Sequence, residues 1–206
     1  TNVDVSDLGT KTTTSGSLTF IGAYEKIDVS GNDDNLKTLN VYTTNPEGTT
    51  LDIHDSTGIT ALTVKNVVYY NVKGSYDKSM NNPLYRGVSF ITSEGADASK
   101  ELDLGDLSEM TTCEINGAGL TSFTSPSFAN ASGTTLDVSG NALTSVSLGN
   151  ASNARTVDVG YNMLMDVDVS GLDACNDLYV NDNFLTTLDI SQLSDNLTSG
   201  LHAQNN

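Results

Sequence analysis

The chain is poor in the residues on which most enzymes and nucleic-acid-binding proteins depend. Its 206 residues include no tryptophan, 6% aromatic residues, two cysteines, two histidines and nine lysines or arginines. It also lacks an apolar run of the roughly 18 residues needed to cross a membrane. Small aliphatic side chains must therefore supply the core, and the many Ser, Thr, Asn, Gly and Asp residues suit a chain with many tight turns.

The shortage of cations excludes several classes of partner. Nine Lys or Arg residues face 26 Asp or Glu residues, which gives a formal net charge of −17. Because phosphate groups are bound by basic surfaces, this charge argues against nucleic acid and anionic lipid as partners. Residues 101–206 hold a single cation, Arg155. The acidic surface is interpreted as either a solvated exterior or a site for divalent cations.

Motifs of catalysis are missing as well. The chain has no P-loop, no glycine-rich dinucleotide fingerprint, no HExxH and no nucleophile elbow, so we expect no enzyme. His54 and His202 lie too far apart in the sequence pattern to share a site. Cys113 and Cys175 lie about three coils apart, beyond the reach of a disulfide, so we predict two unpaired, buried thiols.

One pattern repeats three times between residues 136 and 190. The repeats start at Leu136, Val157 and Leu178, each 21 residues after the last, and each begins with an apolar-polar-apolar triplet that recurs ten residues later. Alternation of this kind buries one side of a short strand. A fixed period of this length is typical of a solenoid. We therefore predict a mainly β fold, a parallel β-solenoid with two short strands per 21-residue coil and little helix.

An asparagine recurs between the two apolar triplets of every repeat. Each stands where the chain must turn inward, so its side chain can bond backbone groups of the bend that have no other partner. Stacked copies would form a ladder that stabilises parallel coils. The members of this predicted structural ladder are Asn141, Asn162 and Asn183.

The texts "LDVSGNALTSVSLGN", "VDVGYNMLMDVDVS" and "LYVNDNFLTTLDIS" resemble leucine-rich repeats of the short, roughly 21-residue type found in bacterial surface proteins. The resemblance covers residues 134–193 and weakens upstream, where the spacing is irregular. It implies a parallel-stranded solenoid used for binding or surface display, and it carries over no catalytic residues.

Apolar pairs at looser intervals extend the pattern towards the N-terminus, from Leu18 and Phe20 to Leu62 and Val64. The sequence therefore predicts one solenoid domain over residues 1–206. Its predicted parts are an N-terminal strand and flexible arm (1–17), irregular coils (18–125) with an insertion (65–87), regular repeats (126–193) and a C-terminal cap (194–206).

The insertion at 65–87 is the predicted contact region. It concentrates tyrosines and cations, which give adaptable contacts to sugars and protein surfaces, and insertions in repeat proteins emerge on one face as loops. The alternative is a surface loop whose tyrosines pack over the sheet edge. The candidate partner-binding residues are Tyr69, Tyr76, Lys78, Tyr85 and Arg86.

Aspartates recur at outward positions of the repeats. The register places Asp137 beside Asp158 and Asp168 beside Asp189, about 4.8 Å apart, where like charges repel. Water and salt, a divalent cation or a cationic partner could relieve this repulsion. No EF-hand spacing occurs, and we expect no cofactor unless calcium binds at corners rich in Asp and Asn. The weak calcium candidates are Asp33, Asp34, Asn181 and Asp182.

Two functions follow from this pattern. The first is a non-enzymatic, extracellular or surface-displayed repeat domain that binds protein or glycan in adhesion. The alternative is a self-assembling structural subunit of a fibre, sheath or shell, for which a virion surface would be the location. Partners are then a protein or glycan surface or further copies of the chain, without nucleic acid and without membrane insertion.

Overall fold

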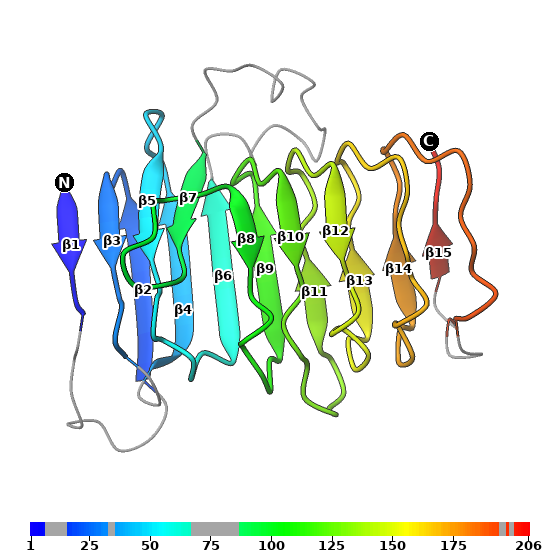
Figure 1. Cartoon of the computed structure of the whole chain (residues 1–206), viewed down its shortest axis with the longest axis horizontal. Helices are drawn as coiled ribbons and strands as arrows, with labels where there is room; N and C mark the ends of the chain where they lie inside the picture. Colours follow the sequence, from blue (N-terminus) through cyan, green and yellow to red (C-terminus); the bar gives the residue numbers. More distant parts are fainter. Residues whose placement is uncertain (7–15, 33–35, 67–86, 194–196, 198–199) are drawn as a thin grey trace.

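The chain winds into a parallel β-solenoid, as the repeats predict. The computed structural model describes residues 1–6, 16–32, 36–66, 87–193, 197 and 200–206. Within these residues every regular element is a strand, and no helix is long and apolar enough to cross a membrane. Successive coils follow one another along the long axis of the molecule, and the two termini lie at its opposite ends (Figure 1).

One flank of the solenoid is a continuous eight-stranded parallel sheet, which we call the large sheet. Leu136 pairs with Val157 and Val157 with Leu178, so the 21-residue period is the step from one strand to the next. The strands, in spatial order, are β15 (Gly200–His202), β14 (Asp177–Tyr179), β13 (Thr156–Asp158), β11 (Thr135–Asp137), β9 (Thr112–Asn116), β6 (Ala61–Asn66), β4 (Leu36–Thr43) and β2 (Gly16–Gly22).

The opposite flank is divided between two smaller parallel sheets. Past the second of them, Val167 and Val169 are buried as predicted, but the described residues 159–176 and 180–193 form no strand. The two predicted strands per coil are therefore found over most of the solenoid and not in its last coils. The strands are β1 (Asn2–Asp4), β3 (Lys26–Asp28), β5 (Thr49–Asp52) and β7 (Val88–Ile91) in one sheet, and β8 (Glu101–Asp103), β10 (Ser122–Thr124) and β12 (Ser145–Ser147) in the other.

The division of this flank coincides with the insertion. β6 and β9 are neighbours in the large sheet although 51 residues separate Thr60 from Thr111, whose hydroxyl donates to the Thr60 carbonyl. Within this excursion the chain forms β7, turns back so that Ser99 pairs antiparallel with Phe90, and then forms β8. Lys65 and Asn66, which the sequence analysis assigned to the insertion, are the last two residues of β6.

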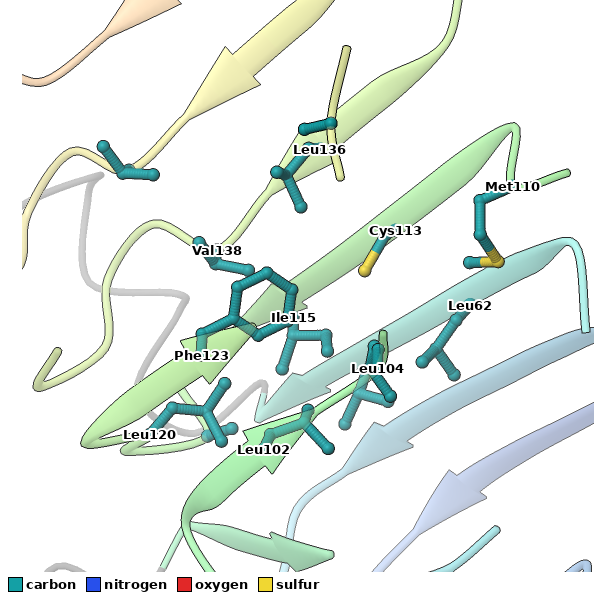
Figure 2. Close-up of a cluster of buried hydrophobic side chains, with 14 of the residues drawn as sticks. Leu62, Leu102, Leu104, Met110, Cys113, Ile115, Leu120, Phe123, Leu136 and Val138 are labelled. Carbon is teal, nitrogen blue, oxygen red and sulfur yellow. The ribbon is translucent and has the colours of Figure 1, made fainter. Parts of the chain in front are cut away.

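A thin aliphatic core lies between the two flanks. Figure 2 shows Leu62 and Leu136 of the large sheet directed towards Leu102 and Phe123 of the opposite flank. All four side chains are at most 2% exposed. Alternation explains the arrangement, because every second residue of a strand points to the same side.

Five consecutive coils bend at one corner of the large sheet through a residue with positive φ. The φ angles lie between 54° and 65°, where a side chain costs about 1 kcal/mol or more unless the residue is glycine. In three of these coils the next residue is a predicted ladder asparagine, Asn141, Asn162 or Asn183, and its side chain is buried. The five corner residues are Gly117, Gly140, Tyr161, Asp182 and Asn205.

Candidate functional site

The asparagine ladder links each coil to the coil before it. Asn162 shows the geometry: its Nδ2 donates to the carbonyls of Val138 and Val159, both at 3.1 Å. Its Oδ1 accepts from the backbone N–H of Leu143 at 3.1 Å. One side chain thus satisfies backbone groups of two coils that the bend leaves without a ladder partner. The predicted positions are all at most 5% exposed: Asn141, Asn162 and Asn183.

Further asparagines perform the same task, among them Asn206 and Asn32, which the sequence analysis did not predict. Asn206 donates to the carbonyls of Val180 and Ala203 at 3.1 and 2.8 Å. On the opposite flank, Asn32 donates to the carbonyl of Val29 at 2.7 Å and to that of Val5 in the previous coil at 3.1 Å. The signal for Asn206 was present, because "LHAQNN" carries the spacing of "LYVNDN" with alanine in place of valine. Residues 200–206 therefore shield β14 by adding another rung to the large sheet.

Seven outward aspartates each close a turn of their own chain. In each, Oδ1 accepts the backbone N–H of the residue two positions later, at 2.8–3.1 Å. Where that residue is serine, its hydroxyl also donates to the same oxygen in three cases, at 2.6–2.7 Å. An aspartate followed two residues later by Ser or Gly was a readable signal for this turn. The aspartates are Asp4, Asp28, Asp103, Asp137, Asp158, Asp168 and Asp189.

Three carboxylates stand side by side on the outer face of the large sheet. Glu114 pairs in register with Asp137, and Asp137 with Asp158. Among the described residues, cationic and amide side-chain donors reach the first two of these carboxylates and not Asp158: Lys65 Nζ lies 2.7 Å from Glu114 Oε2, and Asn116 Nδ2 lies 2.8 Å from Asp137 Oδ1. We call Glu114, Asp137 and Asp158 the carboxylate row.

Asp158 is the least compensated member of the carboxylate row. Burial raises the pKa of its carboxyl to about 7, the charge of Asp137 adds to this rise, and the Gly160 N–H opposes it. The row continues beyond Asp158 with an aromatic pair. The rings of Tyr179 and His202 stack with centroids 4.2 Å apart and planes 1° apart. This face of the large sheet therefore offers negative charge next to aromatic edges.

A second charged cluster lies on the opposite flank. Lys26 Nζ lies 2.9 Å from Asp28 Oδ2 and 3.3 Å from Asp52 Oδ2. His54 Nδ1 lies 2.5 Å from Asp52 Oδ1, and this hydrogen bond raises the pKa of the imidazole. The His54 side chain is half-buried beside Asp52. The Lys26–Asp52–His54 cluster compensates a buried carboxylate and contains no nucleophile.

The weak calcium candidates lack a suitable arrangement where they are described. Asp182 Oδ2 accepts from Asn181 at 2.8 Å, and Asp182 Oδ1 accepts from Asn205 at 3.1 Å, so amide donors occupy both oxygens. No group of three or more His, Cys, Asp or Glu in the described part of the chain could hold a metal ion. Asp33 and Asp34 lie outside the described residues.

The predicted partner-binding residues also lie outside the described residues. They are Tyr69, Tyr76, Lys78, Tyr85 and Arg86. The thiols are described: Cys113 and Cys175 are buried and unpaired, as predicted. Burial raises the pKa of both, for Cys175 to about 11, so neither is a reactive thiolate at neutral pH.

In the carboxylate row, Asp137 and Asp158 are fixed by turns of their own chain and Glu114 is paired with Lys65. Comparison of the chain with models of protein families, with curated proteins and with solved structures finds no match.

Proposed function

We propose that the chain is a non-enzymatic, leucine-rich-repeat-like domain that binds a protein or glycan surface, displayed outside a cell. The outer face of the large sheet is the proposed contact. The observation that carries the proposal is the carboxylate row, in which Glu114, Asp137 and Asp158 lie in register on adjacent strands. Like charges at this spacing repel, and a cationic or hydroxyl-rich partner would relieve the repulsion.

The surroundings of the row support binding. Threonines Thr112, Thr135 and Thr156 occupy the same outward position on three neighbouring strands. They give a flat, hydroxyl-bearing strip beside the carboxylates. Tyr179 and His202 add aromatic edges at the end of the row. Hydroxyls, carboxylates and aromatic rings are the groups that hydrogen-bond sugars and the polar rims of proteins.

The test is capture of partners by the immobilised chain. Arrays of glycans and of secreted and surface proteins are probed with the wild type and with a Thr112→Arg/Thr156→Arg variant, which blocks the face without touching a turn. The matched control, Ser145→Arg/Ser147→Arg, adds the same charge to exposed positions of the opposite flank. We expect capture to be lost only in the first variant. Equal capture by all three proteins would refute the proposal.

Self-assembly is the second candidate, favoured by the open edges of the large sheet. Within the described part of the chain, strands β2 and β15 have one neighbour each in that sheet. They also carry the exposed apolar side chains Ile21 (70% exposed) and Leu201 (38% exposed). Unpaired strand edges can accept a strand of another molecule. Light scattering and electron microscopy of the pure protein decide the point, since monomers at high concentration would eliminate this candidate.

A further inference from the structure

The last coils enclose a groove on the flank opposite the large sheet. It has a volume of about 610 Å³ and is lined by residues 166–170, residues 187–189 and Gln192. We call it the C-terminal groove. It lies past β12, the last described strand of that flank, where the two bordering coils form no strand on the groove side.

The backbone along the groove lacks the pairing found elsewhere in the solenoid. On the large sheet, β13 and β14 of the same coils pair residue by residue. On the groove side, no backbone hydrogen bond within the described residues joins 165–170 to 186–191 or to 144–149. Some of their backbone groups are bonded locally: the N–H groups of Val167, Ser170 and Ser191 donate to aspartate Oδ1 atoms, and the carbonyls of Val169 and Ile190 each accept an N–H from three residues later. Within the described residues the N–H and C=O groups of Asp168 and Leu188 have no backbone partner, so they are available to an added strand.

The charge along the groove is uniformly negative. Asp166, Asp168 and Asp189 are exposed and line it. Asp168 and Asp189 are held in place, since each accepts a backbone N–H from the serine two residues later at 2.9 Å. The hydroxyl of that serine, followed by its backbone N–H, lowers the pKa of each carboxyl and keeps it ionised at neutral pH.

Apolar side chains lie beside the carboxylates. Leu188 is half-buried in the groove wall and Ile190 is 41% exposed. An extended peptide places alternate side chains on opposite sides. It could therefore set small apolar side chains against Leu188 and Ile190 while its cations meet the carboxylates.

We propose that the C-terminal groove binds an extended, lysine- or arginine-bearing segment of a partner protein by strand addition. The inference rests on the proposed binding function and gives it a second contact surface and a partner chemistry. Main-chain hydrogen bonds provide the affinity, and the three carboxylates select for positive charge.

Titration calorimetry with a synthetic peptide of about ten residues that alternates lysine and valine tests the proposal. The same peptide N-methylated at alternate residues keeps the charge and loses half of the backbone donors. We expect it to bind at least about tenfold more weakly, as loss of several hydrogen bonds requires. An Asp168→Asn/Asp189→Asn variant should weaken the unmodified peptide by a similar factor. The charge-matched control, Glu94→Gln/Asp97→Asn, changes exposed residues away from the groove and should bind as the wild type does.

Three outcomes would overturn the proposal. Equal affinity for the methylated peptide means charge attraction without strand addition, and equal weakening by the control variant means non-specific attraction to an acidic protein. Sedimentation that shows a dimer abolished by Asp168→Asn/Asp189→Asn means that a second copy occupies the groove. The proposed function has a separate readout, because the Thr112→Arg/Thr156→Arg variant can lose array capture while groove binding persists, and the reverse can also occur.

Discussion

The two flanks of the solenoid are built from the same coils but differ in order. The large sheet is continuous over eight strands, whereas the opposite flank is divided into two sheets and ends at β12. The large sheet has a buried amide at one corner, where Asn141, Asn162 and Asn183 tie each coil to the previous one. The difference indicates that corner hydrogen bonds, in addition to aliphatic packing, hold neighbouring strands in register.

Hydrogen bonds at the corners of the opposite flank support this interpretation. Asn32 and Ser56 bond the carbonyl of Val29 beside the four-stranded sheet, and Asn150 bonds the Ser125 carbonyl beside β12. One period after Asn150 the chain has Gly171, which cannot make such a bond. The sheet ends at that coil, and the C-terminal groove begins.

Removal of a ladder amide should have the largest effect. Asn162→Ala leaves the carbonyls of Val138 and Val159 and the Leu143 N–H without this partner in a dry interior. We expect the free energy of unfolding to fall by about 3 kcal/mol or more, measured by urea denaturation. Ser56→Ala, on the opposite flank, removes a single hydroxyl and should cost about 1 kcal/mol. Equal losses would contradict the difference between the flanks.

Core truncation compares the packing of the same coil on its two sides. Leu178 in β14 is fully buried and Leu188 beside the groove is half-buried. Leu178→Ala should destabilise the fold by about 3 kcal/mol. Leu188→Ala should destabilise it by about 1 kcal/mol, because folding buries less of the apolar surface of Leu188. Thermal unfolding followed by circular dichroism measures both. A larger loss at Leu188 would show that the groove wall is as well packed as the large sheet.

The stability contributed by Asp158 on the large sheet and by Asp168 on the opposite flank should change with pH in opposite directions. The Asp158 carboxyl has a raised pKa, about 7, in the folded chain, so the folded state holds the proton more tightly than the unfolded state does. Its contribution to stability is complete below the unfolded pKa near 4 and is lost as pH rises through about 7. Asp168 has a lowered pKa, so its contribution is present above that unfolded value and is lost on acidification. Denaturation midpoints measured from pH 4 to 8 should fall less steeply in Asp158→Asn than in the wild type. An unchanged slope would show that Asp158 does not titrate in this range.

The corner backbone should give the smallest difference. Gly140 has a φ of 65°, so Gly140→Ala places a side chain in the left-handed region at a cost of about 1 kcal/mol. Gly149, on the opposite flank, has room for a methyl group and no positive φ, so Gly149→Ala should be close to neutral. Urea midpoints of the two variants provide the comparison. A neutral Gly140→Ala would mean that the corner relaxes out of the left-handed region.

Repetition made the fold predictable. Leu136, Val157 and Leu178 recur without a gap, and the irregular upstream pairs, such as Leu39 with Leu62, prove to share the same register. The division of the opposite flank was not predictable, because the pairing of Phe90 with Ser99 depends on where the insertion returns the chain in space.

The surface chemistry was predictable only in part. The sequence placed Asp137 beside Asp158 correctly. It did not show that their Oδ1 atoms serve turns of their own chain, because that use depends on backbone geometry two residues later. The C-terminal groove lies where the described residues 165–170 make no backbone hydrogen bonds to the neighbouring coils. No local sequence motif predicts that such bonds are missing.

The asparagine ladder has a direction, and this bears on how the molecule is wound during synthesis. The N–H of Leu143 donates to Oδ1 of Asn162, and the N–H of Leu164 donates to Oδ1 of Asn183, so each donor finds its acceptor in the coil that follows. Each turn of the chain is thus completed by the turn that leaves the ribosome after it. Growth should proceed as in a one-dimensional lattice with nearest-neighbour coupling, in which each new turn completes the hydrogen bonds of the turn before it.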